Sequence, residues 1–234
     1  MSKNLSLIVN SSGVEEKRVF PRFPFCFLTF KPDESSQTFE VRDISSTGMQ
    51  LCLKDGELNY THNTDIKGHV HWFGDDLELS GRIKWLEDQR MGIEFSEDYL
   101  ENVYQFFSNK NLAPNLKLIQ SGLGIDLPPK LRSWLHCDGP VDCFIWQHGE
   151  GSIESFQFIR FNSFVEWDDK KGLRTGRVLS KRHKETPLVS EDEVIFQIDH
   201  KPDIEKIELV KDLIASSKLS ICLLYTSPSP RDRG

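Results

Sequence analysis

The feature that most constrains the fold is a series of short apolar stretches in the first half of the chain, each bounded by turn-forming residues. Apolar and polar side chains alternate in two of them, so that Phe39 and Val41 share one face of the first, and Met49 and Leu51 share one face of the second. Such alternation is typical of a half-buried β-strand. Six short strands with this punctuation predict a small antiparallel barrel or sandwich. The strand-like stretches are 25–30, 38–44, 48–54, 66–73, 77–86 and 90–95.

A helix is expected directly after the last of these strands. Ser96 stands where it can cap the N-terminus of this helix. The apolar residues that follow recur at helical spacing. They are Tyr99, Leu100, Val103, Phe106 and Phe107.

Two short motifs accompany the first strands and carry groups that suit ligand binding. Arg18 and Arg22 stand four residues apart before the first strand, and a guanidinium can pair with phosphate oxygens or with the edge of guanine. Asp43, Ser45 and Gly48 form an Asp-x-Ser-x-x-Gly pattern where one strand turns into the next. The carboxylate can accept hydrogen bonds from guanine N1 and N2, the hydroxyl can donate or accept, and the glycine permits a tight turn. The alternative is a solvated basic face followed by an ordinary β-turn.

In this order, the two motifs resemble those of the PilZ domain, a bacterial family of receptors for cyclic di-GMP. The resemblance covers residues 15–110 and implies a six-stranded antiparallel β-barrel followed by a helix, with 91–95 as the closing strand. It implies that cyclic di-GMP is the ligand and that no other cofactor is needed. The implied ligand residues are Arg18, Arg22, Asp43, Ser45 and Gly48.

The segment that carries the two arginines is expected to be mobile before ligand arrives. Residues 14–23 are rich in charge, contain Pro21 and lack an apolar alternation that would hold them on a barrel face. Phe20 precedes the proline, so the segment is expected to be extended rather than helical. Phosphate charge would then order it.

The rest of the chain resembles no family known to us. Residues 1–14 are expected to be a loose leader, 111–123 a connector and 124–220 a second, β-rich domain with some helix. Within that domain we expect a helical turn at Leu131, Trp134 and Leu135, and a closing helix after Pro202. Its expected strands are 141–147, 153–161, 164–167, 172–179 and 194–198.

Residues 222–234 are interpreted as an artefact of sequence assembly. From Cys222 to Asp232 the chain matches one reading frame of a common transposase sequencing adapter, and its prolines follow a helical pattern without a cap. We therefore exclude this stretch from reasoning about the fold and expect the natural C-terminus to be missing.

Three further groups of residues in the second half could form a site, but a purely structural role is the simpler interpretation of each. The possible zinc ligands do not have the spacing of a common zinc site. The possible nucleophile and base are not accompanied by the strand–turn–helix motif, called a nucleophile elbow, that presents a catalytic serine. The run of basic residues is explained by exposure to solvent. The zinc candidates are His136, Cys137, Cys143 and His148. The nucleophile–base candidates are His183 with Cys143 or Ser180. The basic run comprises Arg174, Arg177, Lys181, Arg182, His183 and Lys184.

Charge and composition narrow the function further. The net charge of −7 and the pI near 5.5 argue against binding nucleic acid polymers or membrane surfaces. The chain has no apolar stretch of membrane-spanning length, and its five cysteines, an odd count without CxxC spacing, fit a reducing cytoplasm. We expect a non-catalytic cyclic di-GMP receptor that changes its contacts with a second domain or a downstream protein. The alternatives are an adaptor that binds protein without the ligand, and an enzyme whose catalytic part lies in the second half.

Overall fold

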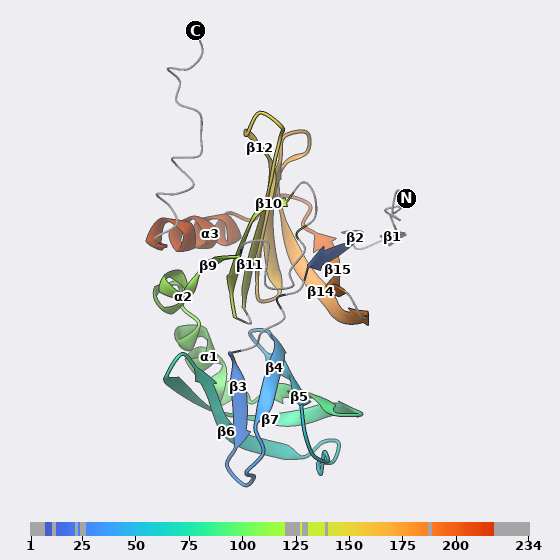
Figure 1. Cartoon of the computed structure of the whole chain (residues 1–234), viewed down its shortest axis with the longest axis vertical. Helices are drawn as coiled ribbons and strands as arrows, with labels where there is room; N and C mark the ends of the chain where they lie inside the picture. Colours follow the sequence, from blue (N-terminus) through green and yellow to red (C-terminus); the bar gives the residue numbers. More distant parts are fainter. Residues whose placement is uncertain are drawn as a thin grey trace. The chain divides into compact units, whose positions relative to one another are not determined.

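The computed structural model describes residues 8–10, 13–21, 23, 27–119, 127, 131–138, 140–186 and 189–217. They are mainly β-strand, with three α-helices (Figure 1). The chain divides into two compact units. The barrel unit comprises Phe25–Ser108 and Asp138–Pro140, and the sheet unit comprises Met1–Pro24, Asn109–Cys137 and Val141–Gly234.

The barrel unit is a closed six-stranded antiparallel barrel, in the strand order β3-β4-β5-β8-β7-β6. The predicted six-stranded barrel with a following helix is confirmed, because the turn residues had marked the strand ends to within a few positions. The strands are β3 (Thr29–Pro32), β4 (Phe39–Ile44), β5 (Gly48–Leu53), β6 (Asp65–Trp72), β7 (Asp75–Glu87) and β8 (Arg90–Phe95).

The alternating residues fill the inside of the barrel, as their period of two requires. Met49, Leu51 and Leu53 of β5 are all buried. A short 3-10 helix, η1 (Glu97–Tyr99), leads from β8 into α1 (Leu100–Phe106). Ser96 is the N-cap residue of η1, as expected, but its side chain makes no capping hydrogen bond; its backbone carbonyl accepts from Tyr99 N at 3.0 Å.

The sheet unit contains an antiparallel nine-stranded sheet in the order β1-β2-β15-β14-β13-β12-β11-β10-β9. Its last helix, α3 (Ile204–Ser216), begins at Asp203, whose carboxylate accepts hydrogen bonds from the backbone N–H groups of Glu205 and Lys206. The predicted β-rich second region is confirmed. Its strands are β1 (Ile8–Asn10), β2 (Gly13–Pro21), β9 (Lys117–Ile119), β10 (Leu131–Cys137), β11 (Val141–Gln147), β12 (Ile153–Arg160), β13 (Ser163–Asp168), β14 (Gly172–Thr186) and β15 (Val189–Ile198).

Two segments of the sheet unit have a different secondary structure from the one expected. The helical turn predicted from Leu131, Trp134 and Leu135 is wrong, because these residues lie in β10. Trp134 pairs with Phe144 and Leu135 with Cys143, so the two side chains lie on opposite faces, and both are buried. A strand that is covered on both faces loses the alternation that identifies it. The expected connector contains the helix α2 (Asn109–Asn115), with Pro114 in its last turn, and the short strand β9.

The N-terminal arginine segment is a strand of the sheet unit. Strand β2 pairs with β15 along its length, from Glu15 opposite Gln197 to Pro21 opposite Glu191. Phe20 is only 5% exposed, and its ring stacks on Phe144 at 4.7 Å between centroids. The expectation that nothing holds this segment in place was therefore wrong. A single buried aromatic side chain, that of Phe20, anchors the segment to the sheet unit, and no alternating series of apolar residues is needed.

The remaining expectations about the ends of the chain are tested only in part. Strand β1 and the first residues of β2 fall within the expected leader. The stretch 222–234 lies outside the described residues. Among the helices that are described, none has the length and apolar character needed to cross a membrane.

Candidate functional site

Asp43 lies at an irregularity of the barrel. The register of β4 against β5 shifts between Val41 and Asp43, so Arg42 is the extra residue of a β-bulge. After the bulge Asp43 pairs with Gln50. One carboxylate oxygen of Asp43 accepts a hydrogen bond from the backbone N–H of Ile44 at 3.0 Å. The bulge thus sets the direction of the Asp43 side chain, as bulges beside functional sites often do.

Ser45 uses its hydroxyl to hold the turn between β4 and β5. The oxygen accepts from the backbone N–H of Gly48 at 3.1 Å and of Thr47 at 3.3 Å. The same hydroxyl lies 3.1 Å from the carbonyl oxygen of Gly48, to which it donates. The backbone closes the turn as well, with Ser45 N–H donating to Gly48 O at 2.8 Å. This serine therefore shapes the motif as a turn residue.

Gly48 is needed because β8 approaches closely. A Cβ atom at this position would lie 2.4 Å from the carbonyl oxygen of Ile93. That distance is far below van der Waals contact, and the neighbouring atom is backbone rather than a flexible side chain. The glycine of the motif thus lets the turn lie against the next strand.

A row of paired residues runs from Asp43 across the outer face of the barrel. Asp43 pairs with Gln50, Gln50 with Gly92, and Gly92 with Trp85. Paired residues of antiparallel strands share a face, and the neighbours of Gln50, Met49 and Leu51, are buried inside. The row therefore faces outward.

The Trp85 ring lies across Gly92. A Cβ at Gly92 would be 2.0 Å from Trp85 Nε1, so any larger residue here would displace the ring. The tryptophan remains 39% exposed. Our sequence reasoning missed Gln50, Gly92 and Trp85 as site residues. The sequence does carry one signal for these residues. A glycine in the middle of a predicted strand indicates the close approach of another group, and the preceding predicted strand contains a tryptophan.

Cationic side chains beside the bulge are held by a buried acid. Glu40 is only 9% exposed, and its carboxylate lies 2.9 Å from Arg42 Nη2. It also forms an ion pair with Lys54. The outer face next to Asp43 thus combines a carboxylate, an amide, an aromatic ring and paired cations.

Arg18 lies in the sheet unit, where its guanidinium is largely enclosed. Its side chain is 17% exposed, and Nη1 lies 2.7 Å from a carboxylate oxygen of Glu166. Nη1 also donates to Gln157 at 2.8 Å, and Nε donates to Glu16 at 3.0 Å. The guanidinium carbon stands 5.4 Å from the centre of the Phe196 ring. Burial lowers the pKa of Arg18, but the hydrogen bond and charge of Glu16 and Glu166 outweigh it and raise the pKa above its ordinary value.

A second arginine, Arg174, binds the same two carboxylates as Arg18. Arg174 Nη2 lies 2.6 Å from Glu166, and Nη1 lies 3.5 Å from Glu16. Burial raises the pKa of Glu16, yet the hydrogen bond from Arg18 and the two arginine charges leave it below its ordinary value. We call Glu16, Arg18, Gln157, Glu166 and Arg174 the Arg18 cluster.

The structure thus distributes the predicted site residues between the two units. Asp43, Ser45 and Gly48 come together at one turn of the barrel. Arg18 lies in β2 of the sheet unit. Arg22 lies outside the described residues.

With this geometry in hand, comparison with known protein families matches residues 16–105 to the PilZ domain. The chain contains a PilZ domain. The closed six-stranded barrel with its following helix agrees with that assignment. The PilZ family binds cyclic di-GMP. The match begins within β2, so the PilZ profile includes residues that the structure places in the sheet unit.

Other comparisons add little to the PilZ assignment. One solved structure, that of MrkH from K. pneumonia in its apo state, matches with a TM-score of 0.23 and 10% sequence identity. The match covers 84% of this chain and 89% of that chain. No curated protein matches the sequence. The assignment therefore depends on the PilZ match and the barrel.

The residues considered as zinc ligands or as a nucleophile and its base make ordinary structural contacts where the structure describes them. His136 Nδ1 lies 2.7 Å from Asp142, and His148 Nε2 lies 3.0 Å from Asp169. Burial raises the pKa of the Cys143 thiol to about 12. The described part of the chain contains no group of three or more histidine, cysteine, aspartate or glutamate side chains suited to a metal ion. Nothing is described of the side chains from 180 to 192, which include Ser180 and His183.

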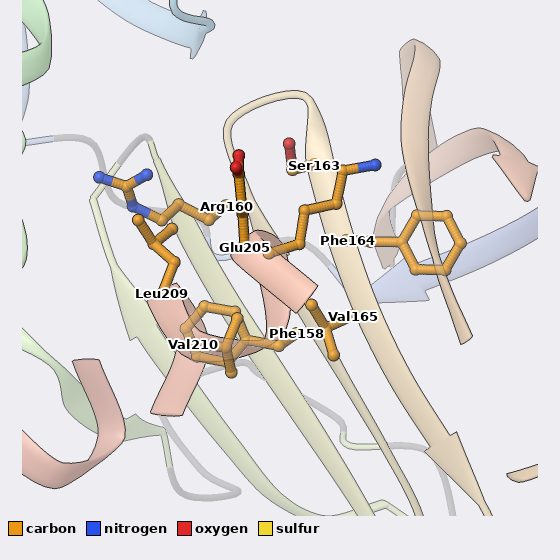
Figure 2. A pocket seen from close by; sticks show the side chains of 9 residues that line it. Phe158, Arg160, Ser163, Phe164, Val165, Glu205, Leu209 and Val210 are labelled. Carbon is orange, nitrogen blue, oxygen red and sulfur yellow. The ribbon is translucent and has the colours of Figure 1, made fainter. Parts of the chain in front are cut away.

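A cavity of about 160 Å³ lies in the sheet unit between α3 and the hairpin of β12 and β13. Figure 2 shows apolar side chains from both the helix and the strands around it, among them Phe158, Leu209 and Val210. Lys206 lines it too, but its amine donates to Asp199 at 2.6 Å and to the Gly176 carbonyl at 3.1 Å. The cavity is mainly an apolar space between helix and sheet, and none of the predicted ligand residues that the structure describes lines it.

Proposed function

We propose that this protein is a non-catalytic receptor that binds cyclic di-GMP on the outer face of its PilZ barrel. Asp43 would bind a guanine base, with Ser45 and Gly48 shaping the turn that presents it. Arg18 and Arg22 would bind phosphate. The observation that carries the proposal is the outward row of Asp43, Gln50, Gly92 and Trp85, which joins a motif residue to a flat aromatic surface.

The chemistry of this row suits guanine. The Asp43 carboxylate can accept from both N1–H and N2–H of that base, whereas adenine offers no such pair of donors on the same edge. The Gln50 amide stands beside it and can both donate and accept. Trp85, whose ring lies over Gly92 and is partly exposed, offers a surface on which a purine can stack.

The arginines would supply the positive charge that two phosphates need. A guanidinium binds phosphate through a planar pair of N–H groups, and such charge-assisted bonds are stronger than neutral ones. Because β2 is paired with β15 and Phe20 is packed in the sheet unit, Arg18 reaches a phosphate only at the cost of these contacts, which lowers the net affinity. We therefore expect micromolar rather than picomolar affinity.

The main alternative is a PilZ adaptor that binds a protein partner without the nucleotide. The complete set of motif residues favours the receptor, since an adaptor has no need of the carboxylate at the bulge. We place the receptor in the cytoplasm of a bacterium and expect a downstream protein partner. Within the described residues, the thiols of Cys52 and Cys143 form no disulfide, which fits a reducing compartment.

Calorimetric titration tests the proposal directly. The protein should bind cyclic di-GMP, and cyclic di-AMP should bind far more weakly. Asp43→Ala should weaken binding of cyclic di-GMP by about 1.5–3 kcal/mol, the net worth of hydrogen bonds to a charged group. Asp65→Ala is the matched control, because Asp65 pairs with Arg82 on another strand of the same barrel. Equal affinity of the unmutated protein for both nucleotides would show that Asp43 is only a turn residue.

A further inference from the structure

We infer that the sheet unit regulates the receptor by holding Arg18, so that the carboxylates of Glu16 and Glu166 compete with the phosphates of cyclic di-GMP for one guanidinium. This inference rests on the proposed function, because it takes Arg18 as a ligand residue. It assigns to the second unit a role in setting the affinity of the PilZ site.

The contacts of Arg18 are those that a phosphate would make. Its Nη1 faces one carboxylate and the Gln157 amide, and its Nε faces a second carboxylate. Two anionic groups thus occupy the fork of N–H donors that would otherwise pair with phosphate oxygens. A guanidinium held in this way is not available to a ligand until these contacts break.

The strand has to move for Arg18 to be released. Side chains alternate along β2, so Glu16, Arg18 and Phe20 share the enclosed face, while Lys17 and Val19 lie on the exposed one. Phe20 is packed between Phe144 and Phe196 on that enclosed face. Because β2 also pairs with β15, the arginine and the aromatic ring are held together as one element.

Some buried polar atoms of the Arg18 cluster lack a hydrogen-bond partner in the described part of the chain. Within the described residues, Gln157 Nε2 and Arg174 Nε are buried without a hydrogen-bond partner. Gln157 is completely buried and Glu166 is 4% exposed. Buried polar atoms that lack partners make such a network less stable than a fully bonded one. The cluster can therefore hold Arg18 and still release it to a ligand of higher charge.

Two states follow, one with β2 in the sheet and one with Arg18 on the ligand. The apparent dissociation constant for cyclic di-GMP is the intrinsic one divided by the fraction of molecules in the second state. Any change that weakens the Arg18 cluster without touching the barrel should therefore tighten binding. Any change that locks β2 in the sheet should weaken it.

Removing one competing charge is the first test. Glu166→Gln keeps the side-chain size, and calorimetry should show cyclic di-GMP binding about tenfold more tightly than in the unmutated protein, the factor associated with one charge-assisted hydrogen bond. Asp199→Asn is the matched control, because Asp199 lies in the same unit and carries the same charge but is bonded to Thr175 and Lys206 rather than to Arg18. The control should bind as the unmutated protein does. Unchanged or weaker binding by a folded Glu166→Gln variant would overturn the inference.

Locking the strand is the second test, and it does not depend on the stability of the Glu166→Gln variant. Lys17 and Ile195 stand directly opposite each other on β2 and β15. Paired positions of antiparallel strands are close enough for a disulfide. The double variant Lys17→Cys/Ile195→Cys should lose at least tenfold in affinity when oxidised and regain it on reduction. The two single variants should not respond to reductant.

The outcomes separate this inference from the proposed function. If the oxidised double variant binds cyclic di-GMP as tightly as its reduced form, Arg18 binds no phosphate by leaving the sheet, and the inference fails while the receptor stands. If the unmutated protein and the reduced variant both fail to bind the nucleotide, the proposed function fails and the inference falls with it. Loss of affinity on oxidation alone supports both.

Discussion

The placement of Phe20 gives a sharp prediction about the stability of the sheet unit. Phe20→Ala removes a ring that is 5% exposed, stacked on Phe144 at 4.7 Å and set edge-on to Phe196 at 6.0 Å. Replacing a buried phenylalanine with alanine typically costs 3–5 kcal/mol, through lost burial and the cavity left behind. We expect a loss of about 3 kcal/mol or more in the free energy of unfolding of this unit.

Val19→Ala is the matched control on the other face of the same strand. Val19 is 40% exposed. With about 0.8 kcal/mol for each buried methylene, the loss of two carbons at this site should cost about 1 kcal/mol. The two variants should therefore differ by at least about 2 kcal/mol.

Urea unfolding followed by tryptophan fluorescence measures the difference. Trp134 lies 5.5 Å from Phe144 between ring centroids, so its signal reports the part of the sheet that contains Phe20. With a slope of about 2 kcal/mol per molar urea, the midpoint of this transition should be about 1 M lower in Phe20→Ala than in Val19→Ala. Equal midpoints in the two variants would show that Phe20 does not hold β2 in the sheet.

Three further predictions concern the barrel turn, the outer face and the effect of acid. Gly48→Ala should destabilise the barrel by about 1–3 kcal/mol in thermal unfolding, since its Cβ would meet a backbone carbonyl, whereas Gly149→Ala has open space and should change little. Trp85→Ala should weaken cyclic di-GMP binding by about 1–3 kcal/mol without a comparable loss of stability, and no change in affinity would remove the stacking surface from the site. The folded-state pKa of Glu16 lies below its ordinary value of 4.5, so its stabilising contribution is present above that pH and is lost as the pH falls through the folded-state pKa. Urea unfolding at pH 6 and pH 3.5 should show this loss, and it should be smaller in Glu16→Gln.

The local parts of this structure could be predicted from the sequence, because they follow from side-chain period and turn residues. The alternation through Met49 and Leu51 and the glycine of the motif predict β5 and the turn before it. Strand β10 was missed since Trp134 and Leu135 are buried on opposite faces, a pattern that a single sequence does not distinguish from a helical turn.

The contacts of Arg18 could not be predicted, because they depend on pairing between distant parts of the chain. Its partner Gln157 is 139 residues away. Nothing in the short basic segment indicates that Glu166 is its partner. Strands β15 and β14 lie between β2 and β13 in the sheet, so the two side chains meet only because the sheet curves and brings non-neighbouring strands together. The same holds for Trp85, whose contact with Gly92 depends on the register between β7 and β8.

The position of β2 at one end of the chain, with its partners near the other, also has a consequence for synthesis. At about 5–20 residues per second, a ribosome needs roughly 7–28 s to travel the 139 residues between Arg18 and Gln157. All six barrel strands are complete before Gln157 is made, and domains generally fold as units, the N-terminal ones first. The arginine segment of the nascent chain therefore exists for many seconds after the barrel has folded and before Glu166, its carboxylate partner on β13, has been made. During that interval a nucleotide meets no competition from Glu166, an opportunity that the finished protein does not offer.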